Sequence, residues 1–185
     1  MKKMENRFCC FLRGVNVKGT SMKMADLKTA FEKMGFTNIS TIQASGNVIF
    51  DSSENKNKEE LKNVIEESLS SYFQYDANVF LRNKEEIEEL LNTGKSLAVP
   101  EDCHLYSLIC DSKEALDELK DLFVQTAHEP MEEYSAAEAD AFWIVPKGST
   151  LSSEFGSKVL GKKRYKSLLT SRNINTIEKV YKALL

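Results

Sequence analysis

The residue types best suited to binding chemistry gather in two short stretches near opposite ends of the chain. In the C-terminal stretch, Arg172 and Asn173 precede a predicted helix, for which Asn175 and Glu178 have the spacing of an N-terminal capping box. The start of a helix offers backbone N–H groups and a partial positive charge, and an arginine adds a fork of donors. This pattern fits an anion-binding site, but an arginine paired with a carboxylate and an asparagine in the helix cap would explain the same residues.

The N-terminal stretch, RGVNVKG, follows the first predicted strand and combines two glycines with Arg13, Asn16 and Lys18. Glycines let backbone N–H groups approach an oxyanion closely. No Lys-Ser/Thr pair follows them, as a Walker phosphate loop requires, so a glycine-containing turn is the competing interpretation. With the polar residues of a predicted hairpin added, the candidate ligand-binding residues are Arg13, Gly14, Asn16, Lys18, Ser45, Asn47, Arg172 and Asn173.

The four cysteines, at positions 9, 10, 103 and 110, show neither paired C-x-x-C spacing nor the framework of a small secreted protein. Cys9 and Cys10 are adjacent in a predicted strand, so their side chains point to opposite faces and cannot share a metal. We interpret all four as reduced core residues, and we expect no metal and no cofactor.

The two histidines, His104 and His128, are the side chains best suited to general acid–base chemistry, but both lie outside the two stretches. No Ser-His-Asp set and no paired carboxylates accompany them. The sequence therefore assigns no catalytic residue.

Composition describes an ordered globular protein of 185 residues, 42% hydrophobic and 29% charged, with only three prolines. No run of about 18 apolar residues is present and no signal peptide is recognisable, so we expect a cytoplasmic protein with no membrane partner. The net charge of −3 is unevenly spread: +2 over residues 1–82, −12 over 83–140 and +7 over 141–185. Such asymmetry can steer an anion or bring complementary segments together.

Hydrophobic periodicity predicts the order βαββαβ for residues 1–82, the ferredoxin-like arrangement. Gly46, in the tight hairpin Ala44-Ser45-Gly46, is expected to take a turn conformation that is costly for other residues. The predicted strands are 7–13, 38–43, 47–50 and 78–82, and the predicted helices are 25–34 and 58–72.

Residues 83–185 repeat this rhythm after a connecting helix, which begins at an Asn83/Glu86 capping box and ends at Gly94. The predicted strands here are 104–110, 133–137, 141–146 and 169–172, with helices after 111, within 153–168 and at the C-terminus. The fold class is thus α+β, a tandem of two βαββαβ units with a C-terminal helix, divided into residues 1–82 and 83–185. Strands 7–13 and 141–146 are apolar at nearly every position, so we expect the two sheets to cover each other or share an interface.

Three segments together resemble the bacterial domain-of-unknown-function family numbered sixteen ninety-seven. They are Arg13–Asn16 with Gly19 and residues 23–27, then residues 45–50, then residues 170–176. The last motif often carries a tryptophan where this chain has Ile174, and Lys18 stands where a glycine is common. The resemblance implies a tandem ferredoxin-like fold and transfers no reaction.

Three functions follow from these observations. The first is binding of a phosphorylated or other anionic small molecule, such as a nucleotide, by the candidate residues above. The second is RNA binding through a sheet face and the basic run at residues 162–166, although residues 45–50 lack the paired aromatics of an RNA-recognition strand and the pI is near 5.6. The third is an enzyme acting on an anionic substrate.

Overall fold

The computed structural model describes residues 6–15, 21–53 and 56–185, so the candidate residues Asn16 and Lys18 lie outside the described residues. The chain divides into two compact units, residues 1–87 with 179–185 (unit 1) and residues 88–178 (unit 2). The sequence places the boundary after residue 82 instead. The difference lies in the first residues of helix α3 (Lys84–Ser96) and the last residues of helix α6 (Ile174–Leu184), which group with unit 1.

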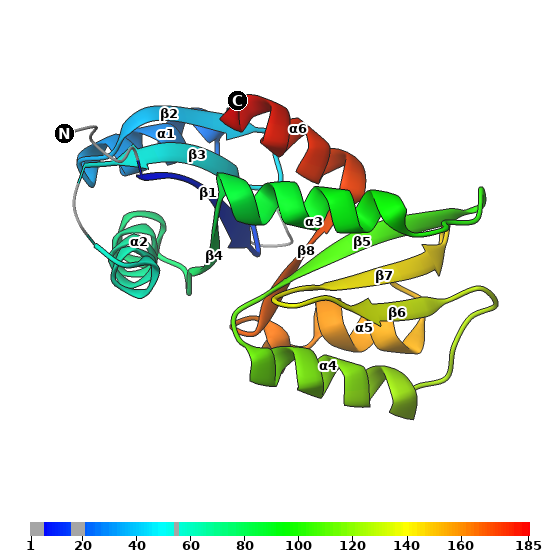
Figure 1. Cartoon of the computed structure of the whole chain (residues 1–185). Helices are drawn as coiled ribbons and strands as arrows, with labels where there is room; N and C mark the ends of the chain where they lie inside the picture. Colours follow the sequence, from blue (N-terminus) through cyan, green and yellow to red (C-terminus); the bar gives the residue numbers. More distant parts are fainter. Residues whose placement is uncertain (1–5, 16–20, 54–55) are drawn as a thin grey trace. The chain divides into compact units, whose positions relative to one another are not determined.

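Unit 1 is built on a four-stranded antiparallel sheet with strand order β2-β3-β1-β4 (Figure 1). This is the strand order of the ferredoxin-like arrangement, so the predicted fold is confirmed for this unit. The inner side chains of the sheet pack with apolar residues of both helices, including Leu27, Phe31, Leu61 and Ile65. The elements are β1 (Asn6–Arg13), α1 (Met24–Lys33), β2 (Thr37–Ile42), β3 (Asn47–Ser52), α2 (Lys58–Phe73) and β4 (Asn78–Asn83).

Unit 2 repeats the topology with strand order β6-β7-β5-β8, again fully antiparallel. A cluster that includes Leu119, Trp143 and Phe155 fills the space between the sheet and its two helices. The fold is therefore α+β with two tandem ferredoxin-like units, as predicted. The elements are β5 (Cys103–Cys110), α4 (Lys113–Gln125), β6 (Glu133–Ala136), β7 (Ala141–Pro146), α5 (Glu154–Gly161), the 3-10 turn η1 (Lys163–Tyr165) and β8 (Leu169–Asn173).

Helix α3 covers the second face of the unit 2 sheet, opposite α4 and α5 (Figure 1). A Cβ atom at Gly94 would lie 2.6 Å from Ile174 Cδ1 and 3.0 Å from Phe142 Cε1, so the glycine lets the helix approach the sheet closely. Gly94 was predicted to end this helix, which is wrong, because α3 continues to Ser96. The second face of β7 is thus covered at Phe142 by a helix of the same unit. None of the described helices is long and apolar enough to cross a membrane.

Gly46 in the β2–β3 hairpin has a φ of 76°, in the left-handed region, as the sequence predicts. A Cβ atom there would also lie 2.9 Å from Val15 Cγ2 and 3.0 Å from Leu12 Cβ. We expect Gly46→Val to lower the free energy of unfolding by about 2 kcal/mol, from backbone strain and overpacking together. Gly148→Val shares the strain, with a φ of 87°, but meets open space, so it should cost less. Equal denaturation midpoints for Gly46→Val and the wild type would contradict this account.

Candidate functional site

The candidate residues of unit 1 that the structure describes gather at one end of its sheet. The backbone N–H of Leu12 donates to the carbonyl oxygen of Gly46 at 2.8 Å, which ties the end of β1 to the β2–β3 hairpin. Strand β1 runs antiparallel to β3, with Phe11 opposite Asn47. The end of the sheet thereby brings together Arg13, Gly14, Ser45 and Asn47.

Within this group, the roles of Asn47 and Arg13 differ. Asn47 is fully buried, and its Nδ2 donates to Ile42 O at 2.7 Å and to Ser45 Oγ at 2.9 Å, so its amide holds the hairpin together. Arg13 is half-buried, and burial lowers the pKa of its guanidinium to about 10. The loss of water from a cation favours contact with negative charge, and Arg13 is therefore the side chain of this group best suited to an anion.

Arg172 is a buried residue of strand β8, with 7% of its surface exposed. It lies opposite Ser107 of β5, and its Nη1 donates to Thr170 Oγ1 and to Ser171 O, both at 2.8 Å. These contacts support a structural role for the guanidinium in unit 2. Arg13 belongs to unit 1, and one anion site shared by the two arginines stays a prediction.

The Arg-Asn pair at the end of β8 is repeated at the end of β4, as Arg82 and Asn83. Arg82 is 9% exposed, and its Nη1 donates to the preceding carbonyl oxygen, Leu81 O, at 2.8 Å, as Arg172 does to Ser171 O. Buried arginines at matched positions of two similar units indicate a common structural device. The repeated Arg-Asn dipeptide is visible in the sequence at residues 82–83 and 172–173.

The two asparagines of these pairs begin the helices that follow. Asn83 Oδ1 accepts from the N–H of Glu86 at 2.9 Å, and Glu86 returns a bond to the N–H of Asn83 at 2.8 Å, which confirms the predicted capping box of α3. Asn173 Oδ1 accepts from the N–H of Asn175 at 3.0 Å, and α6 begins at residue 174. The predicted cap at Asn175 is therefore wrong, because the side chain of Asn173 caps the helix instead.

A pocket of about 550 Å³ opens in unit 2 where α6 begins. It is enclosed by the end of α3, the α3–β5 linker, the start of β5, the turn after β7 and the first turn of α6. Its apolar lining consists of Gly94, Leu97, Val99, Cys103, Leu105 and Ile174. Its polar lining consists of Lys95, His104, Lys147, Asn173, Asn175 and Glu178.

The charged groups of this pocket are two ammonium groups and one carboxylate. Lys95 Nζ lies 2.8 Å from Glu178 Oε1, and the Lys95 side chain is 53% exposed. Lys147 Nζ donates to the carbonyl oxygen of Glu101 at 2.8 Å, and Lys147 is exposed. The first turn of α6 adds the positive end of a helix dipole. The pocket thus carries a small excess of positive charge beside an apolar wall.

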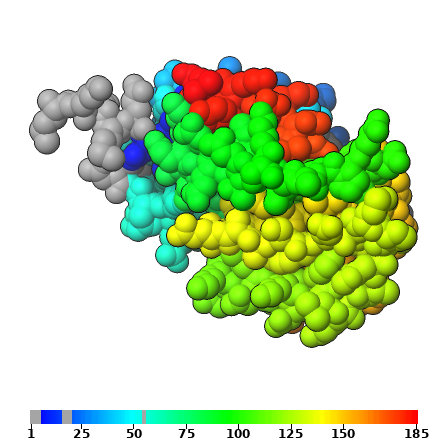
Figure 2. Space-filling model, turned by 45° about the vertical axis from the view of Figure 1, so that its right-hand side comes forward, coloured from blue at the N-terminus to red at the C-terminus, as the bar shows by residue number. Residues whose placement is uncertain are grey.

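The linker between α3 and β5 forms the outer edge of the pocket. Residues 98–102 are all exposed, and Figure 2 shows this segment in green at the surface. Leu97 also lines a second, smaller pocket of about 280 Å³ with Ala98, Phe142, Ile144 and residues 133–135 of β6. Both pockets therefore flank the same leucine on the α3 side of the sheet.

The imidazole of His104 is directed away from the apolar wall of the larger pocket. Its ring lies beside the ring of Tyr106, with centroids 5.9 Å apart, and Tyr106 packs against the core under α4 and α5. Side chains alternate along a strand, so His104 and Leu105 point to opposite faces of β5. The His104 imidazole accordingly lies on the face of β5 opposite Leu105.

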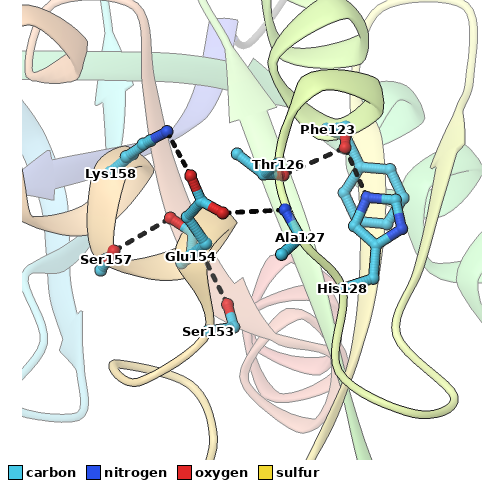
Figure 3. A network of polar contacts seen from close by, with 9 residues as sticks. Phe123, Thr126, Ala127, His128, Ser153, Glu154, Ser157 and Lys158 are labelled. Carbon is cyan, nitrogen blue, oxygen red and sulfur yellow. Dashed lines mark hydrogen bonds and ion pairs between the residues drawn. The ribbon is translucent and has the colours of Figure 1, made fainter.

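His128 serves the end of helix α4 (Figure 3). Its Nε2 lies 2.5 Å from Phe123 O, and its ring stacks on the Phe123 ring with centroids 4.0 Å apart. Thr126 Oγ1 donates to the same carbonyl oxygen at 3.0 Å. These contacts provide partners for a carbonyl oxygen in the last turn of α4, so the role of His128 is structural.

Glu154, in the same network, joins the end of α4 to α5 (Figure 3). Its carboxylate accepts from Lys158 Nζ at 2.7 Å and from the N–H of Ala127 at 2.8 Å. The hydrogen bond from Lys158 and then the one from Ala127 hold the pKa of Glu154 below its ordinary value. A carboxyl with a lowered pKa stabilises the fold above the ordinary pKa and loses this contribution as the pH falls below it.

We therefore expect Glu154→Gln to lower the melting temperature at pH 7, and we expect this difference to shrink towards pH 3, as the pH falls through the lowered pKa of Glu154 and the carboxyl takes up a proton. Thermal unfolding of the variant and the wild type at the two pH values measures this. Glu138→Gln, at an exposed position between β6 and β7, is the matched control and should leave the melting temperature unchanged. A difference that persists undiminished at pH 3 would contradict the assignment.

The basic run at residues 162–166 does not present an aromatic for stacking. Tyr165 is 6% exposed and belongs to the core of unit 2. Arg164 donates to Glu118 Oε1 from Nε at 2.8 Å and from Nη2 at 2.6 Å. Among the described residues, no group of three or more His, Cys, Asp and Glu side chains is arranged to hold a metal ion.

The sequence gives no sign that Lys95 and Lys147 share a pocket, and it marks Glu178 only as part of a capping box. They come from three distant segments, and no spacing rule connects an α3 lysine with a turn after β7. Of the candidate ligand-binding residues that the structure describes, Asn173 alone lines this pocket, and its signal in the sequence is its place before a helix start.

Comparison with solved structures finds the conserved bacterial protein SP0830 from Streptococcus pneumoniae, with a TM-score of 0.76 and 20% sequence identity. The match covers 97% of this chain and 98% of that chain, and it supports the tandem fold. No curated protein matches the chain. The family described as "Protein of unknown function (DUF1697)" matches residues 5–142, which leaves the motif at residues 170–176 outside the matched range. On this match over most of its length, the chain belongs to the DUF1697 family.

Proposed function

We propose that this protein binds a small anionic molecule in the pocket of unit 2 at the start of α6. The supporting observation is that Lys95, Lys147 and the N-terminal turn of an 11-residue helix border one concave space of about 550 Å³. Pockets of this size hold small molecules. The helix dipole and the two ammonium groups all favour negative charge at the same place.

Asn173 connects this proposal with the sequence. Its side chain caps α6, so it fixes where the helix begins and where the positive end of the dipole lies. The other candidate residues, Arg13, Gly14, Asn16, Lys18, Ser45, Asn47 and Arg172, remain a prediction of a separate or extended anion site. We prefer the pocket as the anion site because Arg172 is hydrogen-bonded to Thr170 and Ser171, and Asn47 is hydrogen-bonded within its own hairpin.

The two alternative functions have less support. An RNA-binding sheet needs exposed aromatics on an open face, whereas Tyr165 is buried and the central strands β5 and β7 are covered on both faces. General acid–base catalysis by an imidazole has no support here, because the His104 ring lies beside Tyr106, on the face of β5 opposite Leu105. A cytoplasmic location stays a prediction from the sequence.

The test is a thermal-shift and titration panel of small anions, with inorganic phosphate, sulfate and simple carboxylates as probes. Lys147→Met should weaken anion binding by about tenfold, because one charge-assisted contact is lost. Lys166→Met, which removes an exposed lysine outside the pocket, is the matched control and should bind like the wild type. Equal binding by all three proteins would refute the proposal, provided that Lys147→Met melts at the wild-type temperature.

A further inference from the structure

We infer that the ligand of the unit 2 pocket is a monoanion with an apolar body, a carboxylate rather than a phosphate ester. This inference rests on the proposed function and specifies its ligand class. Two features support it: the small net charge of the lining and the apolar residues in the same lining.

The charge balance of the pocket matches one negative charge. Its lining has two lysines and one glutamate, for a net charge of +1, and Lys95 is already paired with Glu178 at 2.8 Å. A phosphate monoester carries close to two negative charges at pH 7. The second charge would have to sit near the Glu178 carboxylate, and like charges at short range repel. A carboxylate needs a single cation, and Lys147 can supply it without displacing Glu178 from Lys95.

The apolar residues of the pocket are the reason to expect an apolar body on the ligand. Leu97 and Val99 of the α3–β5 linker, Leu105 of β5 and Ile174 of α6 line the pocket. A bare inorganic anion would leave this surface wet, whereas an alkyl or aryl body would remove it from water. The smaller pocket on the other side of Leu97 has Phe142 and Ile144 in its lining beside Glu133, Tyr134 and Ser135, so a longer apolar body would meet further apolar side chains there.

The experiment is calorimetric titration of the full chain with octanoate, octyl phosphate and octanol, which share one body and differ in the head group. Octanoate should bind at least about threefold more tightly than octyl phosphate and about tenfold more tightly than octanol. Lys147→Met should remove most of the difference between octanoate and octanol. Glu178→Gln should improve binding of octyl phosphate more than binding of octanoate, because the repelling carboxylate is gone.

The possible results separate the inference from the function it rests on. Octyl phosphate binding as tightly as octanoate, with both sensitive to Lys147→Met, would overturn the inference and leave an anion pocket. Octanol binding as tightly as octanoate, or no binding by any of the three probes, would overturn both. Preference for octanoate that Lys147→Met abolishes, with a gain for octyl phosphate in Glu178→Gln, is the expected result.

Discussion

Gly156→Ala is expected to lower the free energy of unfolding of unit 2 by about 3 kcal/mol, because the added methyl group has no room. A Cβ atom at this position of α5 would lie 2.2 Å from the backbone oxygen of Thr150 and 2.6 Å from Trp143 Cη2. It would also lie 2.8 Å from Ser153 Oγ, the oxygen that accepts from the Gly156 N–H and caps the helix. Trp143 is fully buried and the Thr150 contact is to the backbone, so neither partner can move aside without a large cost in free energy.

The same helix provides the control for this prediction. Gly161→Ala, at the last residue of α5, meets no atom within 4 Å and should be neutral or slightly stabilising. Urea denaturation of both variants measures the two free energies. A Gly156→Ala protein as stable as Gly161→Ala would show that α5 does not pack against Trp143 as described.

Arg172→Ala is expected to lower the free energy of unfolding by about 2 kcal/mol, since two hydrogen bonds from a charged, buried group are lost together with the packing of its stem. Thr170 Oγ1 would lose its guanidinium partner inside unit 2. The pocket at the start of α6 does not include Arg172 in its lining, so anion affinity should change by less than about threefold in folded protein.

Arg164→Ala is the matched control for this second prediction. Arg164 is 69% exposed and pairs with Glu118 at the surface, and such a pair contributes little to stability because solvent screens it. Denaturation and anion titration of both arginine variants therefore distinguish a structural from a binding role. If Arg172→Ala were as stable as the wild type and bound anions at least about tenfold more weakly, the original anion-binding interpretation of Arg172 would be correct instead.

The fold could be predicted because the strands and helices carry strong periodic signals. The apolar strand at residues 7–13, the hairpin at Gly46 and the capping box at Asn83 each specify local structure, and the βαββαβ order follows from them. The prediction failed where packing outweighs a local signal. Gly94 has the sequence signal of a helix end, but it lies inside α3, where Phe142 and Ile174 occupy the space that a side chain would need.

The candidate site was less predictable than the fold. Arg172 has the residue type and position of an anion ligand, and only its burial and its bonds to Thr170 and Ser171 indicate a structural role. Lys147 has no distinguishing neighbours in the sequence and becomes a candidate only because three distant segments enclose the pocket that it lines. Residues that only the fold brings together leave no periodic pattern in the sequence.

The most direct test of the central claim is amide chemical-shift mapping of the ¹⁵N-labelled full chain during titration with a small anion such as acetate or phosphate. Binding in the unit 2 pocket should shift the amide signals of Gly94, Lys95 and residues 173–175 in a saturable manner. The signals of Gly14 and Ser45, at the end of the unit 1 sheet, should stay in place. Saturable shifts confined to Gly14 and Ser45, with the pocket signals unmoved, would contradict the assignment of the anion site to unit 2.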